Sequence, residues 1–333
     1  MSKPFAQLIE DGGASAGGGV GGHPSEFFRG AHFLEAEGAT HTLRIETDEV
    51  ELLAPLLVRQ VGDGPDQDAV SPYGYPGFSV IGPDRVRSSP DYLRESANAP
   101  GLDPGNVDFS RTGLVSIFIR HRLDLVPFAG ATERNVVQIA DPALPAKSRP
   151  SDRRQVRRNL EAGYTVRLIP GDETSADQRV AFLDLYEQTM RRTEAAPHYF
   201  FGAEYFDRLL PAERTWLALV NDPDGAPAAA SIAAVSDGYL HYYLSGSADS
   251  HLADSPMKNV LARLIEGAEE LQLPLNLGGG IRPGDALEEF KRGYANRTVT
   301  WRTSEIVCDP SRYAELSGDR DVGGFFPAYR APA

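Results

Sequence analysis

Lysine is rare in this chain, so a lysine among potential functional residues is informative. It occurs only at Lys3, Lys147, Lys258 and Lys291. Lys291 lies in the segment LEEFKRGY, directly after Phe290. A lysine ammonium can stabilise negative charge that develops on a reacting oxygen, and Lys291 is the best candidate for that role. The alternative is a cation at a helix end that interacts with the helix dipole, with Phe290 in the core.

Two adjacent tyrosines lie in a strand-like segment, HYYLSGS. Strict alternation predicts Tyr242 and Leu244 on one face, with His241, Tyr243 and Ser245 on the other. A tyrosine hydroxyl at a substrate site can orient substrate or relay a proton; the alternative is a pair of half-buried strand aromatics. His241 and Ser245 are about 13 Å apart at strand rise. Because the chain also lacks a G-x-S-x-G elbow, a serine hydrolase is disfavoured.

Three consecutive glycines follow a short buried strand expected over residues 274–277. Gly278, Gly279 and Gly280 would let a substrate chain approach the backbone closely. A turn that needs positive φ explains one or two of these glycines equally well. We therefore include all three among the candidate substrate-binding residues.

Basic residues cluster between positions 147 and 158 and again between 282 and 302. On a helix, four arginines of the first cluster form one stripe, at Arg153, Arg154, Arg157 and Arg158. A phosphate-rich donor could bind there, and Arg292 and Arg297 could bind a phosphate or a terminal adenosine. The alternative is solvated, exposed surface. The candidate donor-binding residues are Arg154, Arg157, Arg158 and Arg297, with Arg292 among the substrate-binding residues.

Composition limits the class of protein. The 333 residues hold 33 Lys+Arg and 47 Asp+Glu, so the formal net charge is −14, which disfavours a broad nucleic-acid-coating surface. No apolar run is long enough for a membrane span, and no signal peptide is recognised, so we expect a cytoplasmic protein. Cys308 is the only cysteine, which excludes intrachain disulfides and cysteine-based metal sites. The seven histidines show no metal-binding spacing, so we expect no metal.

The pattern of elements predicts an α/β chain with mixed sheets. Strands are expected over 40–47, 50–61, 114–120 and 136–139. The proline-rich segment Asp141–Pro150 is the predicted boundary between domains 1–150 and 151–333, with residues 1–22 as a flexible loop. Beyond it, a helix from 151 or 152 precedes the order β-α-α-β-β-β-α-β-α-β. The long helix over 174–192 is expected to bury Val180, Leu183 and Tyr186.

Several segments, in this order and spacing, resemble the Fem-type branch of the GNAT N-acetyltransferase superfamily. They are SPYGYPGF, VSIFIR, RRQVRRNLEAGYTV, LYEQTMRRTEAAPHYFF, HYYLSGS, LGGG and LEEFKRGY. The resemblance implies two tandem GNAT-like domains with a cleft between them, the N-terminal one on the acceptor side and the C-terminal one on the donor side. It also implies acyl transfer to an amine, with Lys291 and Phe290 near an aminoacyl ester. Tyr73 and Tyr75 would then line the acceptor side, unless they only form a structural turn.

Two departures from the family pattern bear on the donor and the acceptor. Peptidoglycan-bridge enzymes carry Arg-Gly-Pro and an acidic residue where this chain has YPGFSV, so the acceptor or the proton-handling residue differs. Acyl-CoA-binding relatives carry a glycine-rich pyrophosphate loop where this chain has SADSHLADSPMKN. That second departure disfavours acyl-CoA as the donor.

The leading hypothesis is aminoacyl transfer from aminoacyl-tRNA to an amine in a peptide, a cell-wall precursor or a metabolite. The candidate catalytic residues are Lys291 and Tyr243, and the candidate substrate-binding residues include Tyr242, Ser245 and Phe290. We expect no permanently bound cofactor, only an acyl donor as co-substrate. Transfer from acyl-CoA or a carrier-protein thioester is the first alternative, and a non-catalytic GNAT-fold binding module is the second.

Overall fold

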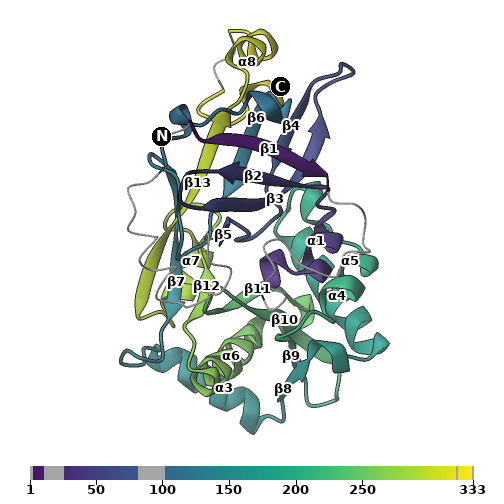
Figure 1. Cartoon of the computed structure of the whole chain (residues 1–333). Helices are drawn as coiled ribbons and strands as arrows, with labels where there is room; N and C mark the ends of the chain where they lie inside the picture. The colour runs from purple at the N-terminus through teal and green to yellow at the C-terminus, as the bar shows by residue number, and fades with distance from the viewer. Residues whose placement is uncertain (1–2, 11–25, 82–101, 320–321, 332–333) are drawn as a thin grey trace. The chain divides into compact units, whose positions relative to one another are not determined.

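The computed structural model describes residues 3–10, 26–81, 102–319 and 322–331 (Figure 1). The predicted glycine-rich loop Gly12–Gly22 lies outside these residues. The chain forms two compact units, and each is built from separate stretches of sequence. The first comprises the described residues of Met1–Pro24, Phe28–Arg134 and Trp301–Ala333, and the second those of Ser25–Phe27 and Asn135–Thr300.

Unit 1 is organised around a mixed sheet in the order β1-β2-β3-β4-β6-β13, with β5 paired to β3. Neighbouring strands are antiparallel except β4 and β6, which are parallel. The strands are β1 (Phe5–Glu10), β2 (His41–Glu46), β3 (Glu51–Gln60), β4 (Gln67–Val70), β5 (Ser79–Ile81), β6 (Ser116–Arg120) and β13 (Arg297–Val307). The prediction of a flexible loop over 1–22 was wrong for Phe5–Glu10. These residues form strand β1, which pairs along its whole length with β2.

In the described part of unit 1, two short helices accompany several 3₁₀ turns. They are α1 (Ala31–Glu37) and α8 (Pro310–Ser317). The unit has its own hydrophobic core, in which side chains of β2, β3 and β6 are fully buried with Phe78. Such burial supplies most of the folding free energy of the unit.

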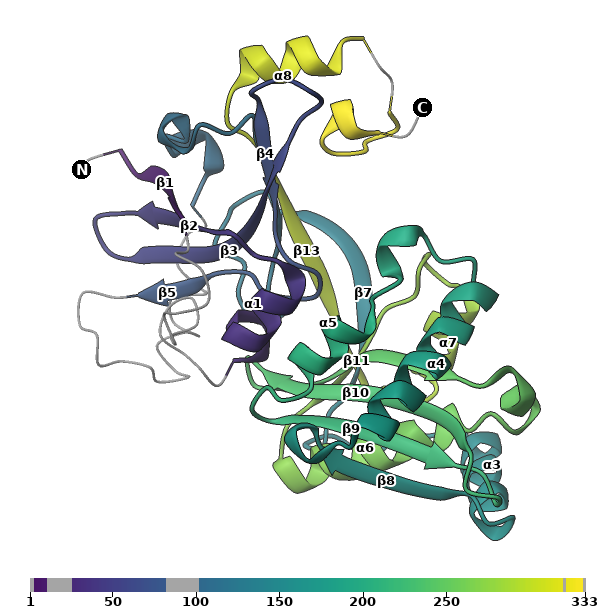
Figure 2. The same ribbon diagram turned by 90° about the vertical axis from the view of Figure 1, so that its right-hand side faces the viewer.

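Unit 2 contains the remaining strands in the order β7-β12-β11-β10-β9-β8, where only β11 and β12 are parallel. Its strands are β7 (Thr132–Ala140), β8 (Thr165–Pro170), β9 (Thr215–Asn221), β10 (Pro227–Ser236), β11 (Tyr239–Ser247) and β12 (Leu275–Gly278). Its helices are α3 (Pro150–Glu161), α4 (Ala176–Arg192), α5 (Ala203–Leu209), α6 (Met257–Leu271) and α7 (Ala286–Arg292). Figure 2 shows α4 and α5 on one face of this sheet and α6 on the other.

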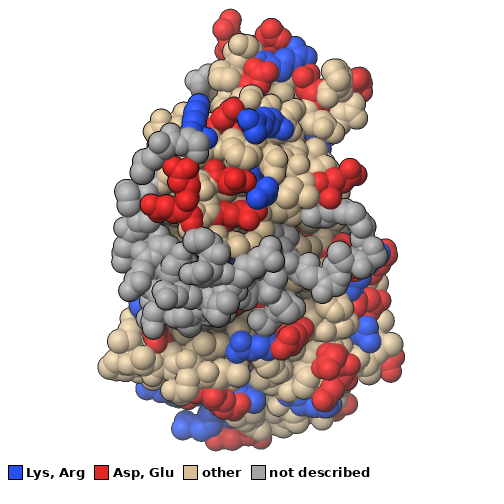
Figure 3. Space-filling model, in the orientation of Figure 1, with Lys and Arg blue, Asp and Glu red and all other residues tan. Residues whose placement is uncertain are grey.

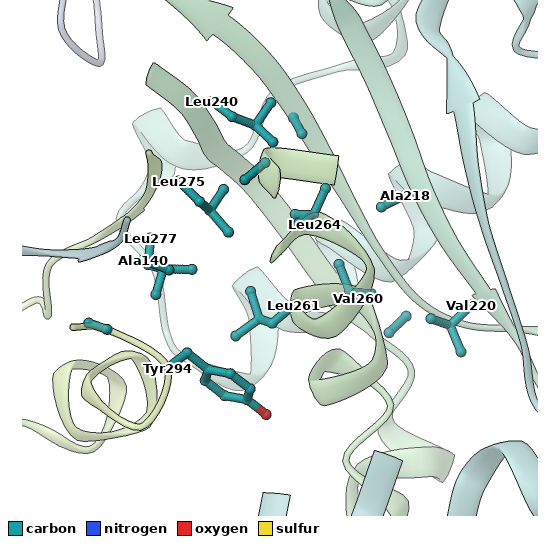
Figure 4. Close-up of a cluster of buried hydrophobic side chains, with 14 of the residues drawn as sticks. Ala140, Ala218, Val220, Leu240, Val260, Leu261, Leu264, Leu275, Leu277 and Tyr294 are labelled. Atoms are coloured by element: carbon teal, nitrogen blue, oxygen red, sulfur yellow. The ribbon is translucent and has the colours of Figure 1, made fainter. Parts of the chain in front are cut away.

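The core of unit 2 lies between the sheet and helix α6 (Figure 4). From α6, Val260, Leu261 and Leu264 are fully buried against strand residues that include Leu240 and Leu275. The opposite face packs so closely that a Cβ on Gly246 would lie 2.3 Å from the backbone of Leu185 in α4. This close contact fixes α4 directly on β11, the strand that carries the two candidate tyrosines.

The predicted elements of the C-terminal half agree with the structure in type and order, with boundaries shifted by a few residues. The assignment of this face was wrong for Val180, which is 65% exposed, and right for Tyr186, which α4 buries together with Phe182 and Leu185. The reason is that α4 packs on β10 and β11, so its buried residues are the ones that face these two strands. Within the described residues, no helix is both long and apolar enough to cross a membrane.

The proline-rich segment is part of unit 2. The N–H of Asp141 donates to Asn296 Oδ1 at 2.8 Å, and Asn296 Nδ2 donates to the carbonyls of Asp141 and Pro145. The compact units divide within β7 and β13, at 134/135 and 300/301. The predicted domains 1–150 and 151–333 stay a prediction. Proline prevents a regular ladder or helix here, but the Asn296 side chain satisfies the backbone groups that proline leaves unpaired.

Candidate functional site

Lys291 is the centre of the candidate site. It lies on α7, where Asp285 caps the helix by accepting a hydrogen bond from the N–H of Glu288 at 2.8 Å. The side chain is only 8% exposed, and its ammonium donates to the carbonyl of Gly279 at 2.7 Å. Burial lowers the pKa of Lys291 to about 8, and nearby Asp285 opposes that shift. The ammonium is therefore charged at neutral pH, but it loses its proton more readily than an exposed lysine.

The glycine turn holds this lysine. Gly278 has φ +77°, and a Cβ there would lie 3.0 Å from Lys291 Nζ. A Cβ on Gly279 would lie 2.3 Å from Asn135 Nδ2, and one on Gly280 would lie 2.3 Å from Asp285 Oδ1. Contacts within the protein thus require glycine at all three positions. Their binding of substrate stays a prediction.

A buried polar chain fixes the start of the same turn. Asn276 Oδ1 accepts from the N–H of Gly278 at 2.8 Å, and Asn276 Nδ2 lies 3.0 Å from His241 Nδ1. His241 Nε2 lies 3.1 Å from the carbonyl of Ser236. Burial lowers the pKa of His241 to about 4, so the ring is neutral at pH 7. It consequently carries its proton on Nε2 and accepts from Asn276 at Nδ1.

Tyr242 supplies the second contact of the lysine. The Lys291 ammonium lies 5.8 Å from the centre of the Tyr242 ring, which packs against the core of unit 2. The hydroxyls of Tyr242 and Ser245 are 2.6 Å apart. Burial raises the pKa of Tyr242 to about 12, so its hydroxyl keeps its proton at neutral pH.

The expected alternation along β11 was wrong for Ser245. The pairing of β10 with β11 shifts between Ile232 and Ala233, which face Leu244 and Tyr242 respectively. Tyr243 is therefore the additional residue of a β-bulge. A bulge reverses the alternation beyond it, and for this reason the Ser245 hydroxyl reaches Tyr242 instead of sharing a face with His241 and Tyr243.

Tyr243 lies on the opposite face of β11 from Lys291. Its hydroxyl is 3.0 Å from that of Tyr205 in α5, and its ring meets Phe27 edge to face with centroids 5.5 Å apart. Figure 2 shows α5 on the face away from α6. The structure thus brings Tyr242 and Ser245 to Lys291 and does not bring Tyr243 there. A catalytic role of Tyr243 stays a prediction.

Phe290 and Arg292, the sequence neighbours of Lys291, have different surroundings. Phe290 packs against the core, with its ring 5.8 Å from that of Tyr294. Arg292 pairs with Glu288 and Glu289 and lies at an open cavity of about 400 Å³. The cavity is lined by Val136, Gln138, Lys147, Glu288, Arg292, Ala295, Asn296, Arg297 and Thr298. Arg297 Nε is 3.1 Å from Asp141 Oδ2.

The predicted arginine stripe is an exposed face of α3. Arg153, Arg154, Arg157 and Arg158 are all exposed, and Arg157 is 3.6 Å from Glu161. Figure 3 shows acidic side chains gathered at the end of the β2–β3 hairpin, whereas basic and acidic side chains are mixed near α3. Contact of the stripe with a donor stays a prediction.

Tyr73 and Tyr75 belong to unit 1. The N–H of Tyr73 donates to Glu37 at 2.7 Å, and the Tyr75 ring meets Phe28 and Trp301 edge to face. The segment is tightly packed, since a Cβ on Gly74 would lie 2.5 Å from the Phe28 ring. These contacts describe a structural turn. The predicted place of both tyrosines on the acceptor side stays a prediction.

Among the described residues, no group of three or more His, Cys, Asp or Glu side chains is arranged to hold a metal ion. The Cys308 thiol is not activated, because burial raises its pKa to about 12.

Sequence reasoning missed Gln138 and Asn276 as residues of the site. Gln138 and Asn276 are polar residues in buried strands, at 2% and 1% exposure. A polar residue within an otherwise apolar strand was the available signal.

The comparisons agree with this architecture. Residues 146–292 match the family described as the acetyltransferase (GNAT) domain. The fold is similar to that of FemX, with a TM-score of 0.58 and 12% identity over 89% of this chain and 96% of that one. The expected α/β fold with mixed sheets is thereby confirmed, and it is similar to the fold of FemX.

Two further structures share the fold. L-PGS from Bacillus licheniformis has a TM-score of 0.52 and 14% identity, over 84% of this chain and 87% of that one. The C-terminal domain of a putative lysylphosphatidylglycerol synthetase from Agrobacterium fabrum has a TM-score of 0.50 and 13% identity, over 86% and 88% of the two chains. No curated protein sequence matches the chain.

Proposed function

We propose that the protein transfers an aminoacyl group from aminoacyl-tRNA to an amine and forms an amide bond. The observation that carries the proposal is the buried Lys291 ammonium on the matched GNAT domain, held by the Gly279 carbonyl and facing the Tyr242 ring. No carboxylate of a described residue forms an ion pair with it. A weakly compensated charge at a buried position is suited to stabilise an oxyanion.

The reaction assigns a role to each group. The amine nitrogen attacks the ester carbonyl, the carbonyl oxygen becomes an oxyanion beside Lys291, and the carbon–oxygen bond to the ribose breaks. The amine loses a proton, and the ribose oxygen gains one. The Tyr242 hydroxyl keeps its proton and lies 2.6 Å from the Ser245 hydroxyl. These two hydroxyls can therefore pass a proton from one to the other during the transfer.

The structural similarity supports aminoacyl chemistry. One of the similar structures is described as a domain of a putative lysylphosphatidylglycerol synthetase, and the other two are FemX and L-PGS. All three are below 15% identical to this chain. The amino acid and the acceptor must therefore come from experiment.

The test is a transfer assay with charged tRNA. A mixture of tRNAs, each charged with a radiolabelled amino acid, is incubated with protein and candidate amines, and deacylation and amide formation are followed. We expect accelerated loss of at least one aminoacyl ester, at least 100-fold slower for Lys291→Met. Arg191→Gln removes the charge of an exposed arginine on α4 and is the matched control. If the protein accelerates neither deacylation nor amide formation with any charged tRNA, the proposal is refuted.

A second candidate is transfer from acyl-CoA, because the matched family is described as an acetyltransferase domain. The same chemistry applies with a thioester, whose sulfur leaves in place of the ribose oxygen. Acyl-CoA added in the same assay separates the two donors. If neither donor is consumed or bound, the protein is a GNAT-fold binding module.

A further inference from the structure

We propose that an apolar cavity under the C-terminal half of α6 binds the branched aliphatic end of a small amine. The cavity lies in unit 2 and has a volume of about 60 Å³. It is lined by Leu168, Trp216, Ala233, Leu240, Leu264, Gly267, Glu270 and Leu271. None of these residues belongs to the candidate site around Lys291, so the cavity is a second, separate site.

The floor and the size of the cavity select the group that binds there. Ala233, Leu240 and Leu264 form an apolar, buried floor, and Figure 4 shows Leu240 on the sheet and Leu264 on α6. Water is a poor occupant, because it needs several polar partners and no side chain of the floor is polar. An apolar cavity of about 150 Å³ binds benzene, and this one has less than half that volume. A branched group of roughly three or four carbons therefore fits better than an aromatic ring.

Gly267 provides part of the space. It lies in the interior of α6, where glycine destabilises a helix relative to alanine. Neither the backbone nor a clash requires glycine there, because the backbone is helical and a Cβ would meet Leu168 at 3.4 Å, an ordinary van der Waals distance. Alanine would therefore fit, but it would occupy part of the cavity. A residue that weakens its own helix and leaves space beside it is expected where a ligand uses that space.

The mouth of the cavity lies between the last turn of α6 and strands β8 and β9. Leu168 on β8 and Trp216 on β9 are only partly buried. On α6, Leu271 is 36% exposed and Glu270 is exposed. The other lining residues are buried. A ligand therefore enters beside the last turn of α6, with its apolar end on the floor and its polar end near Glu270.

The charge at the mouth favours a cation. Glu266, Glu269 and Glu270 are exposed on this part of α6, and Arg263 lies 3.7 Å from Glu266 and 3.2 Å from Glu270. These four side chains together carry 1 − 3 = −2 charges. The last turn of α6 contains no basic residue, although the C-terminal end of a helix favours positive charge. An ammonium group beside Glu270 would supply that charge.

The experiment measures binding of isoamylamine to the intact protein in the absence of an acyl donor. Isoamylamine carries both the branched end and the ammonium. Isoamyl alcohol lacks the charge, ethylamine lacks the branched end, and benzylamine carries a ring in its place. Trp216 is one of two tryptophans, so Trp301→Phe leaves a single fluorescence reporter in the cavity wall. We expect saturable binding of isoamylamine in the millimolar range, tighter than that of the other three probes.

Variants in the same background assign the binding to the cavity. Gly267→Ala should weaken binding of isoamylamine about fivefold, because its methyl group takes up space that the ligand needs, and Gly267→Leu should abolish it. Glu270→Gln should reduce the preference for the amine over the alcohol about threefold. Glu204→Gln removes an exposed carboxylate on α5 and is the matched control, which should change nothing. Thermal unfolding of each variant confirms that it is folded.

The inference is overturned if the fluorescence change does not saturate, or if both Gly267 variants bind isoamylamine as the parent does. Loss of binding in Lys291→Met would also overturn it, because the amine would then occupy the candidate site. Equal affinity for amine and alcohol would overturn the assignment of a cation, and tighter binding of benzylamine would overturn the assigned size. Because no donor is present, the result does not depend on the proposed transfer reaction.

Discussion

The ammonium of Lys291 and the carbonyl oxygen of Gly279 are 2.7 Å apart. The hydrogen bond joins the α7 lysine to a turn whose conformation depends on glycine, so the position of the charge is set by backbone geometry. A neutral carbonyl accepts the hydrogen bond but does not cancel the charge, whereas a carboxylate would. This relationship makes Lys291 suited to stabilise negative charge, and it leads to predictions that can be measured separately.

The first prediction concerns the pH dependence of transfer. The pKa of Lys291 is lowered to about 8, and stabilisation of an oxyanion requires the protonated lysine. We expect the single-turnover rate to fall above pH 8, approaching tenfold per pH unit. With hydroxylamine as the acceptor, ionisation of the acceptor amine does not contribute to the pH profile of the rate, because hydroxylamine is unprotonated across this range.

The opposite profile would contradict this role. A rate that rises through pH 8 with hydroxylamine would mean that neutral Lys291 acts as a base. Lys291→Arg provides the control, because arginine stays charged throughout the range. Residual transfer by that variant should lose the descending limb near pH 8.

The second prediction concerns stability. Unfolded lysine has a pKa of 10.5, and the folded value is about 8, so between these values the unfolded state binds more protons and stability rises with pH. Below pH 8 the buried charge costs up to roughly 3 kcal/mol. Lys291→Met removes this cost and loses about 1 kcal/mol of hydrogen bonding. We therefore expect the variant to be more stable by about 1–2 kcal/mol at pH 7, and no more stable at pH 10.5, in denaturant titrations.

The third prediction concerns the glycine turn. Gly278→Ala forces a side chain into φ +77° and places its Cβ 3.0 Å from Lys291 Nζ. We expect a loss of about 1–2 kcal/mol in stability and at least a tenfold loss in transfer, because the ammonium must move. Gly225→Ala imposes similar strain at φ +88° with nothing within 4 Å. Equal effects of the two variants on transfer would show that the turn does not position the lysine.

The fourth prediction concerns acid. Burial lowers the pKa of His241 and of His121 to about 4, from 6.5. The unfolded state then binds more protons than the folded state between pH 6.5 and 4, so stability is lost as pH falls through this window. Each histidine contributes up to roughly 3 kcal/mol to that loss. His241→Gln should flatten the pH dependence of the unfolding free energy. If the dependence is unchanged, His241 becomes protonated in the folded protein without loss of stability.

Local sequence patterns predicted most of the elements of unit 2. The N-cap Asp285 is an example of a local signal, because an N-cap needs only its own side chain and the N–H groups that follow. Lys291 was found through the resemblance of LEEFKRGY to a family segment. Both signals lie within a few consecutive residues, so the sequence alone was sufficient to identify Asp285 and Lys291.

The missed features depend on pairing between distant segments. The bulge at Tyr243 arises from register against β10, and alternation alone placed Ser245 on the wrong face. The packing of the segment after Asp141 on unit 2 depends on Asn296, 155 residues away. Proline content correctly predicted irregular backbone there, but it carried no information about the segment's partner. For the same reason, the cavity formed by β7, α7 and this segment had no local signal.

The last prediction tests the contact between the Tyr242 ring and Lys291. The ring centre is 5.8 Å from the ammonium, a distance at which an aromatic face stabilises a cation by about 0.5–1 kcal/mol. Tyr242→Phe keeps the ring, so the Lys291 pKa should be unchanged while transfer falls, about tenfold, if the hydroxyl relays a proton. Tyr242→Leu removes the ring, so the Lys291 pKa should fall further, by the equivalent of about 0.5–1 kcal/mol. NMR titration of lysine labelled at Cε measures the pKa directly, and a Leu variant whose Lys291 titrates as in the Phe variant would show that the ring does not stabilise the charge.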